Sequence, residues 1–178
     1  MSDDGQHSGP QRAVRGPVFV EEHMFRLVDI AAPAQGRTPS PDTRADSLVT
    51  FGRDPGLATF TSALEDGKQH VTLELWPAEP PPPEGDWVAG LALRVTVGGG
   101  QLRLASGISS LGSPHELDVS PGTYVLGVWC RGRDAAWTAF LTWLDDEEED
   151  EEQGDGEASV QRAFDGVEQW LLRLWPAG

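Results

Sequence analysis

Residues 117–134, LDVSPGTYVLGVWCRGRD, carry the pattern that decides the fold class of this chain. Between residues 123 and 131 apolar side chains recur at every second position, which is the period of a β-strand and not of a helix. One face of this strand carries Tyr124, Leu126, Val128 and Cys130. The preceding Ser120-Pro121-Gly122 predicts a tight turn, because proline fixes φ and glycine tolerates turn conformations. We interpret the stretch as the central hairpin of an antiparallel β protein.

Short segments of similar character recur along the chain and are separated by turns rich in proline and glycine. The other predicted strands are residues 17–29, 47–51, 57–62, 70–76, 87–97, 101–105 and 168–175. Gly98-Gly99-Gly100 predicts a hairpin between the strands on either side of it. Many short strands with few helical patterns favour an all-β fold, namely an antiparallel β-sandwich similar to a jelly roll.

Residues 135–144, AAWTAFLTWL, fit two kinds of element equally well. In a helix, one face would carry Trp137, Leu141 and Leu144. In a strand, one face would carry Trp137, Ala139, Leu141 and Trp143. Periodicity leaves the choice between helix and strand open.

One hexapeptide occurs twice in the chain. Residues 73–78 read LELWPA, and residues 172–177 read LRLWPA. A single pair of this length is not a solenoid repeat. We interpret it as two strands that end in the same way, with an aromatic side chain over the end of the sandwich and a proline that prevents further pairing.

The negative charge of the chain is concentrated in one segment. The formal net charge is −16, and residues 145–157, DDEEEDEEQGDGE, contain ten carboxylates and no cation. Without them the chain has a formal charge of −6, an ordinary value for a soluble domain. The sequence has no run of Lys and Arg of the kind that binds phosphate groups. Direct binding to nucleic acid or to an anionic membrane surface is therefore not expected.

The acidic segment 145–157 permits three interpretations. Like charges repel one another and cannot be buried together, which predicts a solvated loop. A calcium site is the second interpretation, although the segment lacks the alternating ligand spacing of a calcium loop. In the third, carboxylates at this density imitate phosphate charge and attract a cationic protein.

Residues with catalytic or metal-binding chemistry are scattered. His7, His23, His70 and His115 show no metal-binding spacing, and no G-x-S-x-G motif is present. Cys130 is the only cysteine, so neither an internal disulfide nor a thiolate zinc site can form, and we interpret it as a buried inert thiol. We expect no catalytic residue, no metal, no cofactor and no enzyme activity.

The expected domain organisation is simple. Residues 1–16 are polar and predict a disordered lead-in, and residues 17–178 predict a single β-sandwich domain. The N-terminus has no signal-peptide pattern. No apolar run approaches the ~20 residues that span a bilayer. These features favour a cytoplasmic location.

Seven tryptophans offer a stacking surface for sugars or an interface hot spot, although we expect most of them in the core or over its ends. Trp129 and Arg131 lie on the central strand, and Arg133 follows it. On a rigid support these groups suit recognition of a partner. The other interpretation of Arg131, Arg133 and Asp134 is a salt-bridged corner, worth ~0–1 kcal/mol if exposed.

A family resemblance rests on the order of these elements. An N-terminal strand precedes a strand that ends at Leu75-Trp76, then come residues 93–104, the turn LDVSPGTY at residues 117–124, and a closing strand. This order resembles the competence protein J family, small intracellular inhibitors of a secreted DNA-entry nuclease, and a wider set of uncharacterised bacterial β-sandwich proteins that end in a similar Leu-Trp-Pro-Ala. The likeness covers roughly residues 18–177. Within it, residues 137–166 look like an insertion that contains the acidic segment.

The resemblance implies a compact β-sandwich without catalysis that binds another protein, such as a nuclease or toxin. We therefore predict a non-enzymatic inhibitor or immunity protein directed against a basic nuclease or toxin. The alternative is a carbohydrate-binding β-sandwich that uses exposed tryptophans. The candidate partner-binding residues are Asp145, Asp146, Glu147, Glu148, Glu149, Asp150, Glu151, Glu152, Trp129, Arg131 and Arg133.

Overall fold

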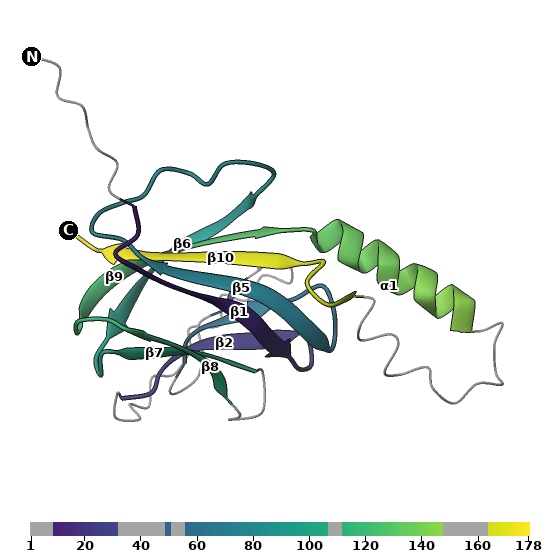
Figure 1. Ribbon diagram of the computed structural model, residues 1–178, viewed down its shortest axis with the longest axis horizontal. Helices are drawn as coiled ribbons and strands as arrows, with labels where there is room; N and C mark the ends of the chain where they lie inside the picture. The colour runs from purple at the N-terminus through teal and green to yellow at the C-terminus, as the bar shows by residue number, and fades with distance from the viewer. Residues whose placement is uncertain (1–8, 32–48, 51–55, 107–111, 148–163) are drawn as a thin grey trace, which may run out of the picture.

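The computed structural model describes residues 9–31, 49–50, 56–106, 112–147 and 164–178 (Figure 1). Within these ranges, ten strands form two five-stranded sheets, and one helix follows the ninth strand. The first sheet, called sheet A, has the order β1 (Arg12–Val20), β5 (Gly67–Leu75), β10 (Gln169–Pro176), β9 (Gly122–Arg131) and β6 (Val88–Val97). The second, sheet B, has the order β3 (Val49–Thr50), β4 (Gly56–Thr61), β2 (Met24–Asp29), β7 (Gln101–Ser106) and β8 (Gly112–Asp118). The predicted all-β sandwich is confirmed.

The core lies between the two sheets, where the alternation of each strand places its apolar side chains. Along β9 the buried side chains are those of Tyr124, Leu126, Val128 and Cys130, which form the face that the sequence pattern selected. An aromatic cluster fills one part of the core. Phe25 stacks on Phe60 with ring centroids 4.7 Å apart, and the edge of Trp170 meets Phe25 at 5.2 Å. Such contacts add to the large apolar area that each ring buries.

The repeated hexapeptide lies on two neighbouring strands of sheet A. β5 and β10 pair in parallel, with Leu73 opposite Leu172 and Leu75 opposite Leu174. The amide of Trp76 continues the pairing by donating to the carbonyl of Leu174 at 2.7 Å. The other described strand pairs are antiparallel. The two copies of the repeat therefore form one in-register block at the centre of sheet A.

The two predicted hairpins at residues 98–100 and 120–122 are wrong. β6 and β9 belong to sheet A, whereas β7 and β8 belong to sheet B, so both turns carry the chain from one sheet to the other. The carboxylate of Asp29 accepts hydrogen bonds from the amides of Gly98 and Gly99 at 2.8 and 2.7 Å. The two turns lie together, because the amide of Val119 donates to the carbonyl of Gly100. A glycine turn predicts that the chain reverses direction, but it does not predict whether the next strand pairs within the same sheet or joins the facing sheet.

The N-terminal region also differs from the prediction. β1 begins at Arg12, so residues 12–16 belong to the sandwich and not to the lead-in. The predicted single strand 17–29 is two strands, one in each sheet, separated by Glu22 and His23 in the left-handed region with φ of 49° and 64°. Residues 12–16 pair with β5, and this non-local pairing orders a segment that composition alone assigns to a polar tail. The domain boundaries otherwise remain a prediction.

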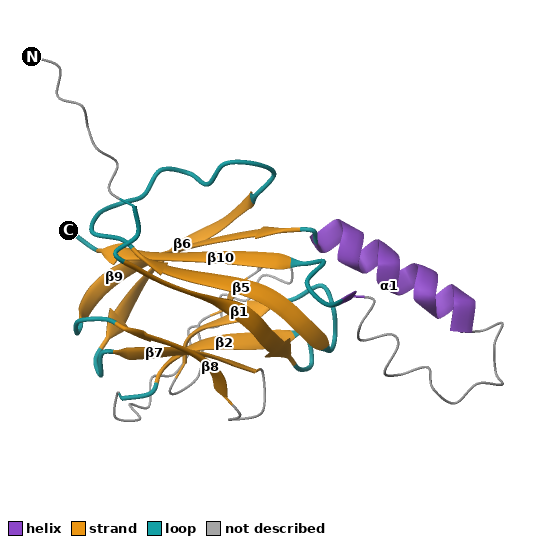
Figure 2. Ribbon diagram, in the orientation of Figure 1, coloured by secondary structure: helices purple, strands orange, loops and turns teal. Residues whose placement is uncertain are grey.

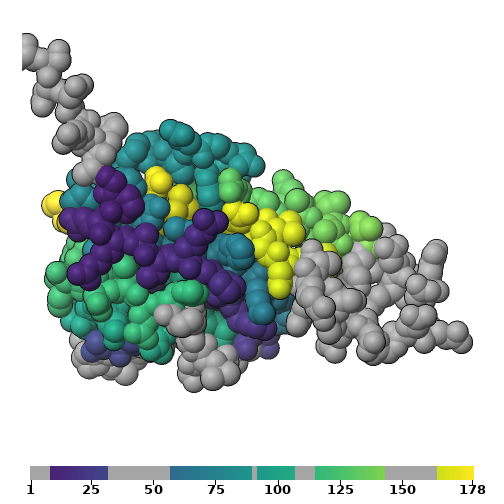
Figure 3. Space-filling view, in the orientation of Figure 1, coloured from purple at the N-terminus to yellow at the C-terminus, as the bar shows by residue number. Residues whose placement is uncertain are grey.

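The ambiguous segment 135–144 is helical. It forms most of α1 (Arg133–Glu147), which projects from the end of the sandwich where β9 and β10 meet the loops (Figures 1 and 2). Figure 3 shows the helix at one end of the molecule, beyond the packed strands. The base of the helix packs on a small apolar cluster of buried residues, Leu64, Ala136 and Phe164, that is separate from the main core.

Candidate functional site

The base of α1 is held by an ion pair between a partly exposed arginine and a buried carboxylate. Glu168, which precedes β10, is completely buried, and Arg133 is the first residue of the helix. The guanidinium of Arg133 donates to Oε1 of Glu168 at 3.0 Å and also to the carbonyl of Thr61. Oε2 of Glu168 accepts from the hydroxyl of Ser62 at 2.5 Å and from the amide of Ala63 at 3.0 Å. The pair thus joins the helix, the entry of β10 and the segment after β4.

Burial decides the electrostatics of this base. Burial raises the pKa of the Glu168 carboxyl, although the hydrogen bond from Ser62 and the charge of Arg133 act in the opposite direction. Burial also raises the pKa of the nearby Cys130 thiol. Cys130 is buried and unpaired by any disulfide, which agrees with an inert thiol and not with a nucleophile. Glu168 and Cys130 therefore belong to the buried structure at the base of the helix.

The exposed side of α1 carries large apolar side chains. Trp137 is 47% exposed and Leu141 is 43% exposed. The ring of Trp137 lies 5.7 Å from that of Phe140, which ties it to the helix and the small apolar cluster. Exposed aromatic side chains on a rigid support are typical anchors of protein interfaces.

The opposite end of α1 is acidic. Asp145, Asp146 and Glu147 are its last three residues, and its last turn contains no basic residue. The remaining candidates, Glu148, Glu149, Asp150, Glu151 and Glu152, lie outside the described residues. Because the C-terminus of a helix carries partial negative charge, carboxylates there are unfavourable unless a cation neutralises them.

Arg131 and Trp129 point to the outer face of sheet A, away from the core. The guanidinium of Arg131 donates to Oε1 of Gln169 at 2.8 Å, contacts Asp86 at 3.4 Å and lies 4.5 Å from the ring centroid of Trp87. Arg131 is therefore held in one orientation. Arg133, two residues later, faces Glu168 instead. The structure thus separates two arginines that the sequence analysis grouped together.

The repeat contributes a second ion pair on the same outer face. Nε of Arg173 donates to Glu74 at 2.9 Å, and the indole of Trp76 donates to the same carboxylate at 2.8 Å. The Arg173 guanidinium lies 5.1 Å from the ring centroid of Trp76 and 5.6 Å from that of Trp129. Both rings are therefore engaged within the sheet.

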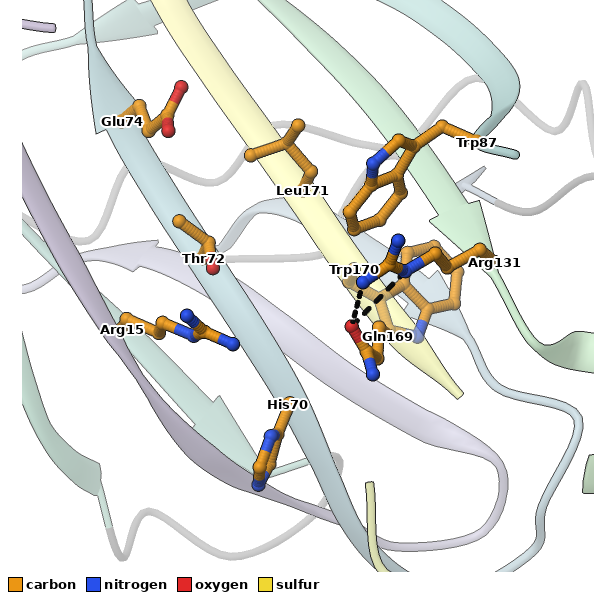
Figure 4. A pocket seen from close by; sticks show the side chains of 9 residues that line it. All are labelled: Arg15, His70, Thr72, Glu74, Trp87, Arg131, Gln169, Trp170 and Leu171. Atoms are coloured by element: carbon orange, nitrogen blue, oxygen red, sulfur yellow. Dashed lines mark hydrogen bonds between the residues drawn. The ribbon is translucent and has the colours of Figure 1, made fainter. Parts of the chain in front are cut away.

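A hollow of about 270 Å³ lies on this face between β1 and β9 (Figure 4). Its lining residues are Arg15, His70, Thr72, Glu74, Trp87, Arg131, Gln169, Trp170 and Leu171. The sequence analysis missed this hollow as a site. The alternation of His70, Thr72 and Glu74 predicts a shared strand face, but no local signal brings Arg15 and Gln169 next to it.

Two negative findings apply to the described part of the chain. No group of three or more His, Cys, Asp or Glu side chains is arranged to hold a metal ion there. No helix there is long and apolar enough to cross a membrane.

No protein-family model matches the chain, and no curated protein sequence matches it. Two solved structures share its fold. One is ComJ from Bacillus subtilis, the inhibitor of the DNA degrading activity of NucA, with a TM-score of 0.52 and 11% identity over 92% of this chain and 96% of that chain. The other is the crocagin biosynthetic gene J protein, with a TM-score of 0.55 and 13% identity over 94% and 98%. The resemblance to competence protein J is thereby confirmed as a likeness of fold.

Proposed function

We propose that this chain is a non-enzymatic protein that binds and inhibits a basic nuclease or toxin, as an inhibitor or immunity protein does. The observation that carries the proposal is the projecting helix α1, on which exposed Trp137 and Leu141 precede the ten-carboxylate segment 145–157. The fold shared with ComJ, an inhibitor of a DNA degrading activity, supports it. A cytoplasmic location is part of the proposal.

The two features of α1 have complementary roles in binding. Clustered carboxylates attract a cationic surface over long range and accelerate the encounter, while contributing less to the final affinity. Trp137 and Leu141 supply apolar area that a partner can cover, and a few such side chains dominate most interfaces. A cationic protein therefore fits this helix better than a neutral one.

The end of α1 gives a further reason for a cationic partner. Asp145, Asp146 and Glu147 place negative charge at the C-terminal end of α1, where it opposes the helix dipole. Lys and Arg side chains of a bound partner would neutralise these charges. Binding would then stabilise the last turn of the helix.

The other candidate residues have secondary roles in this proposal. Trp129 and Arg131 lie on β9, the strand that leads into α1, and extend the surface onto the sandwich. Arg133 acts through Glu168 by fixing where the helix leaves the sandwich. The carbohydrate alternative has less support, because Trp76 and Trp129 both face Arg173, and the exposed Trp137 lies on the helix that leads into the acidic segment.

The decisive experiment measures DNA degradation by basic nucleases purified from the organism that makes this chain, with and without the full-length protein. We expect the wild-type protein to inhibit at least one of them, and the Trp137→Ala/Leu141→Ala variant to lose inhibition. A variant lacking residues 145–157 should associate more slowly, with a weaker dependence on salt.

Phe19→Ala is the matched control, because Phe19 is 45% exposed but lies on β1, which is neither part of α1 nor a neighbour of β9 in sheet A. It should inhibit as the wild type does. Nuclease activity that is unchanged by the wild-type protein, or inhibition that survives the double substitution on α1, would overturn the proposal.

A further inference from the structure

The outer face of sheet A is cationic in an otherwise strongly acidic protein. The five strands of this sheet contain six of the 13 Lys and Arg residues but a single acidic residue, Glu74. The alternation of the strands places five of them on the outer face, namely Arg15, Lys68, Arg94, Arg131 and Arg173. The sixth, Arg12, has the alternation of the inner face and contacts Asp118 of β8 in sheet B. Glu74 pairs with Arg173, and Arg131 contacts Asp86 just outside the strands of the sheet. The fold therefore assembles a cluster of cations that the linear sequence does not show.

The hollow described above lies within this cationic face. Figure 4 shows Arg15 and His70 on its β1–β5 side and Arg131 with Gln169 on its β9–β10 side, with Thr72 and Leu171 between them. Among the described residues, the side chains of Arg15 and His70 make no hydrogen bond or ion pair, so their donors are available to a ligand. Arg131 is already oriented by Gln169 and Trp87, which lowers the entropy cost of binding an anion.

We propose that this hollow binds a phosphate monoester carried on a small ring-containing molecule. Guanidinium groups recognise phosphate oxygens with paired, charge-assisted hydrogen bonds. Two guanidiniums and an imidazole on opposite sides of the hollow suit a tetrahedral group with three terminal oxygens better than a carboxylate with two. The ring of Trp87 and the apolar side chain of Leu171 lie where the ring of the ligand would pack.

Size and net charge favour a small ligand over a nucleic acid. A hollow of about 270 Å³ accommodates a phosphate and one ring, close to the smallest typical ligand pockets. A polyanion that extended beyond the hollow would meet a chain with a net charge of −16. Long-range repulsion would then oppose its binding.

The test is a titration of the ¹⁵N-labelled full-length protein with phenyl phosphate, followed by NMR. We expect saturable shifts of the Trp87 indole and of the amides around Arg15 and His70, with weaker binding of inorganic phosphate. Arg15→Gln should weaken phenyl phosphate binding about tenfold, because it removes a charged hydrogen-bond donor. Arg131→Gln should have an effect at least as large, because that guanidinium is already oriented.

Arg94→Gln is the matched control, since Arg94 is an exposed cation of sheet A outside the hollow. The affinity of this variant for phenyl phosphate should change less than about twofold.

Absence of saturable shifts up to about 10 mM would overturn the proposal, as would equal weakening by Arg94→Gln. Benzoate binding as tight as phenyl phosphate would overturn the phosphate assignment, and tighter binding of an oligothymidylate would overturn the small-ligand assignment. Arg15 lies outside the proposed nuclease-binding surface, so its variant leaves nuclease inhibition unchanged and separates the two proposals.

Discussion

The two ends of α1 differ in whether their charges have a basic partner within the helix. At the base, Arg133 meets the completely buried Glu168, and Ala136 packs on Phe164. At the tip, three consecutive carboxylates end the helix without a basic residue in the last turn. The contacts at the base attach the helix to the sandwich, although burying the Glu168 carboxylate costs desolvation energy. The carboxylates at the tip lie at the C-terminal end of the helix dipole, where they destabilise the helix when no partner is bound. The base of α1 is therefore fixed to the sandwich, while no basic residue of its own last turn offsets the charge of its tip.

Removal of Arg133 should produce the largest effect at the base. Arg133→Ala leaves the Glu168 carboxylate buried without a cation, which typically costs about 3–5 kcal/mol in the free energy of unfolding. Urea denaturation at neutral pH measures this loss. Arg173→Ala is the matched control, because its partner Glu74 is partly exposed to water and the loss should be smaller. Equal losses in the two variants would show that burial does not distinguish the two ion pairs.

Phe164 supports the same base through packing. Phe164→Ala removes the largest buried side chain of the small apolar cluster beneath the helix, and we expect a loss of about 3 kcal/mol, the low end of the range for buried Phe→Ala substitutions. Trp137→Ala is the comparison, since that ring is half exposed and its removal should cost less than about 1 kcal/mol. If both variants unfold at the same urea concentration, the cluster does not hold the base.

The pH dependence of stability tests the charge at the base. Because burial raises the pKa of Glu168, the folded protein binds this proton more tightly than the unfolded chain does. The stability from this group is present below the ordinary pKa of glutamate, about 4.3, and is lost as the pH rises through the raised value. The loss amounts to about 1.4 kcal/mol for each unit by which the two pKa values differ.

Glu168→Gln isolates this contribution because it cannot titrate. Urea denaturation of both proteins from about pH 4 to about pH 8 should show the stability of the wild type falling relative to that of the variant as the pH rises. A difference that stayed constant with pH, or that grew in favour of the wild type, would contradict a raised pKa.

Parts of this arrangement could be predicted from the sequence. The alternation over residues 123–131 identified β9 and its buried face, because a strand with one buried side records that burial in its own pattern. The turns at residues 98–100 and 120–122 were located correctly but connect different sheets. Which sheet the chain enters after a turn depends on residues that are distant in the sequence. At the first of these turns, for example, the Asp29 carboxylate accepts hydrogen bonds from the amides of Gly98 and Gly99.

The sites were harder to predict because they depend on non-local neighbours. The sequence places Glu168 at the start of a predicted strand, but no local signal shows that the fold buries it against Ser62 and Arg133. The cationic hollow has the same origin, since Arg15 and Arg131 lie on strands 116 positions apart in the chain. Only the charge of the helix tip was evident from composition.

The smallest effect concerns the tip and has opposite consequences for stability and binding. Asp146→Asn/Glu147→Gln removes two charges that oppose the helix dipole, so it should stabilise the last turn by about 0.3–1 kcal/mol per charge, measured as slower amide hydrogen exchange there. Asp134→Asn is the matched control from the first turn, where a carboxylate is favourable and its loss should destabilise the helix by a similar amount. If the tip charges serve a cationic nuclease, the tip variant should nevertheless associate with it more slowly while Asp134→Asn does not. A tip variant that was both more stable and equally fast in binding would show that these carboxylates have no role in recognition.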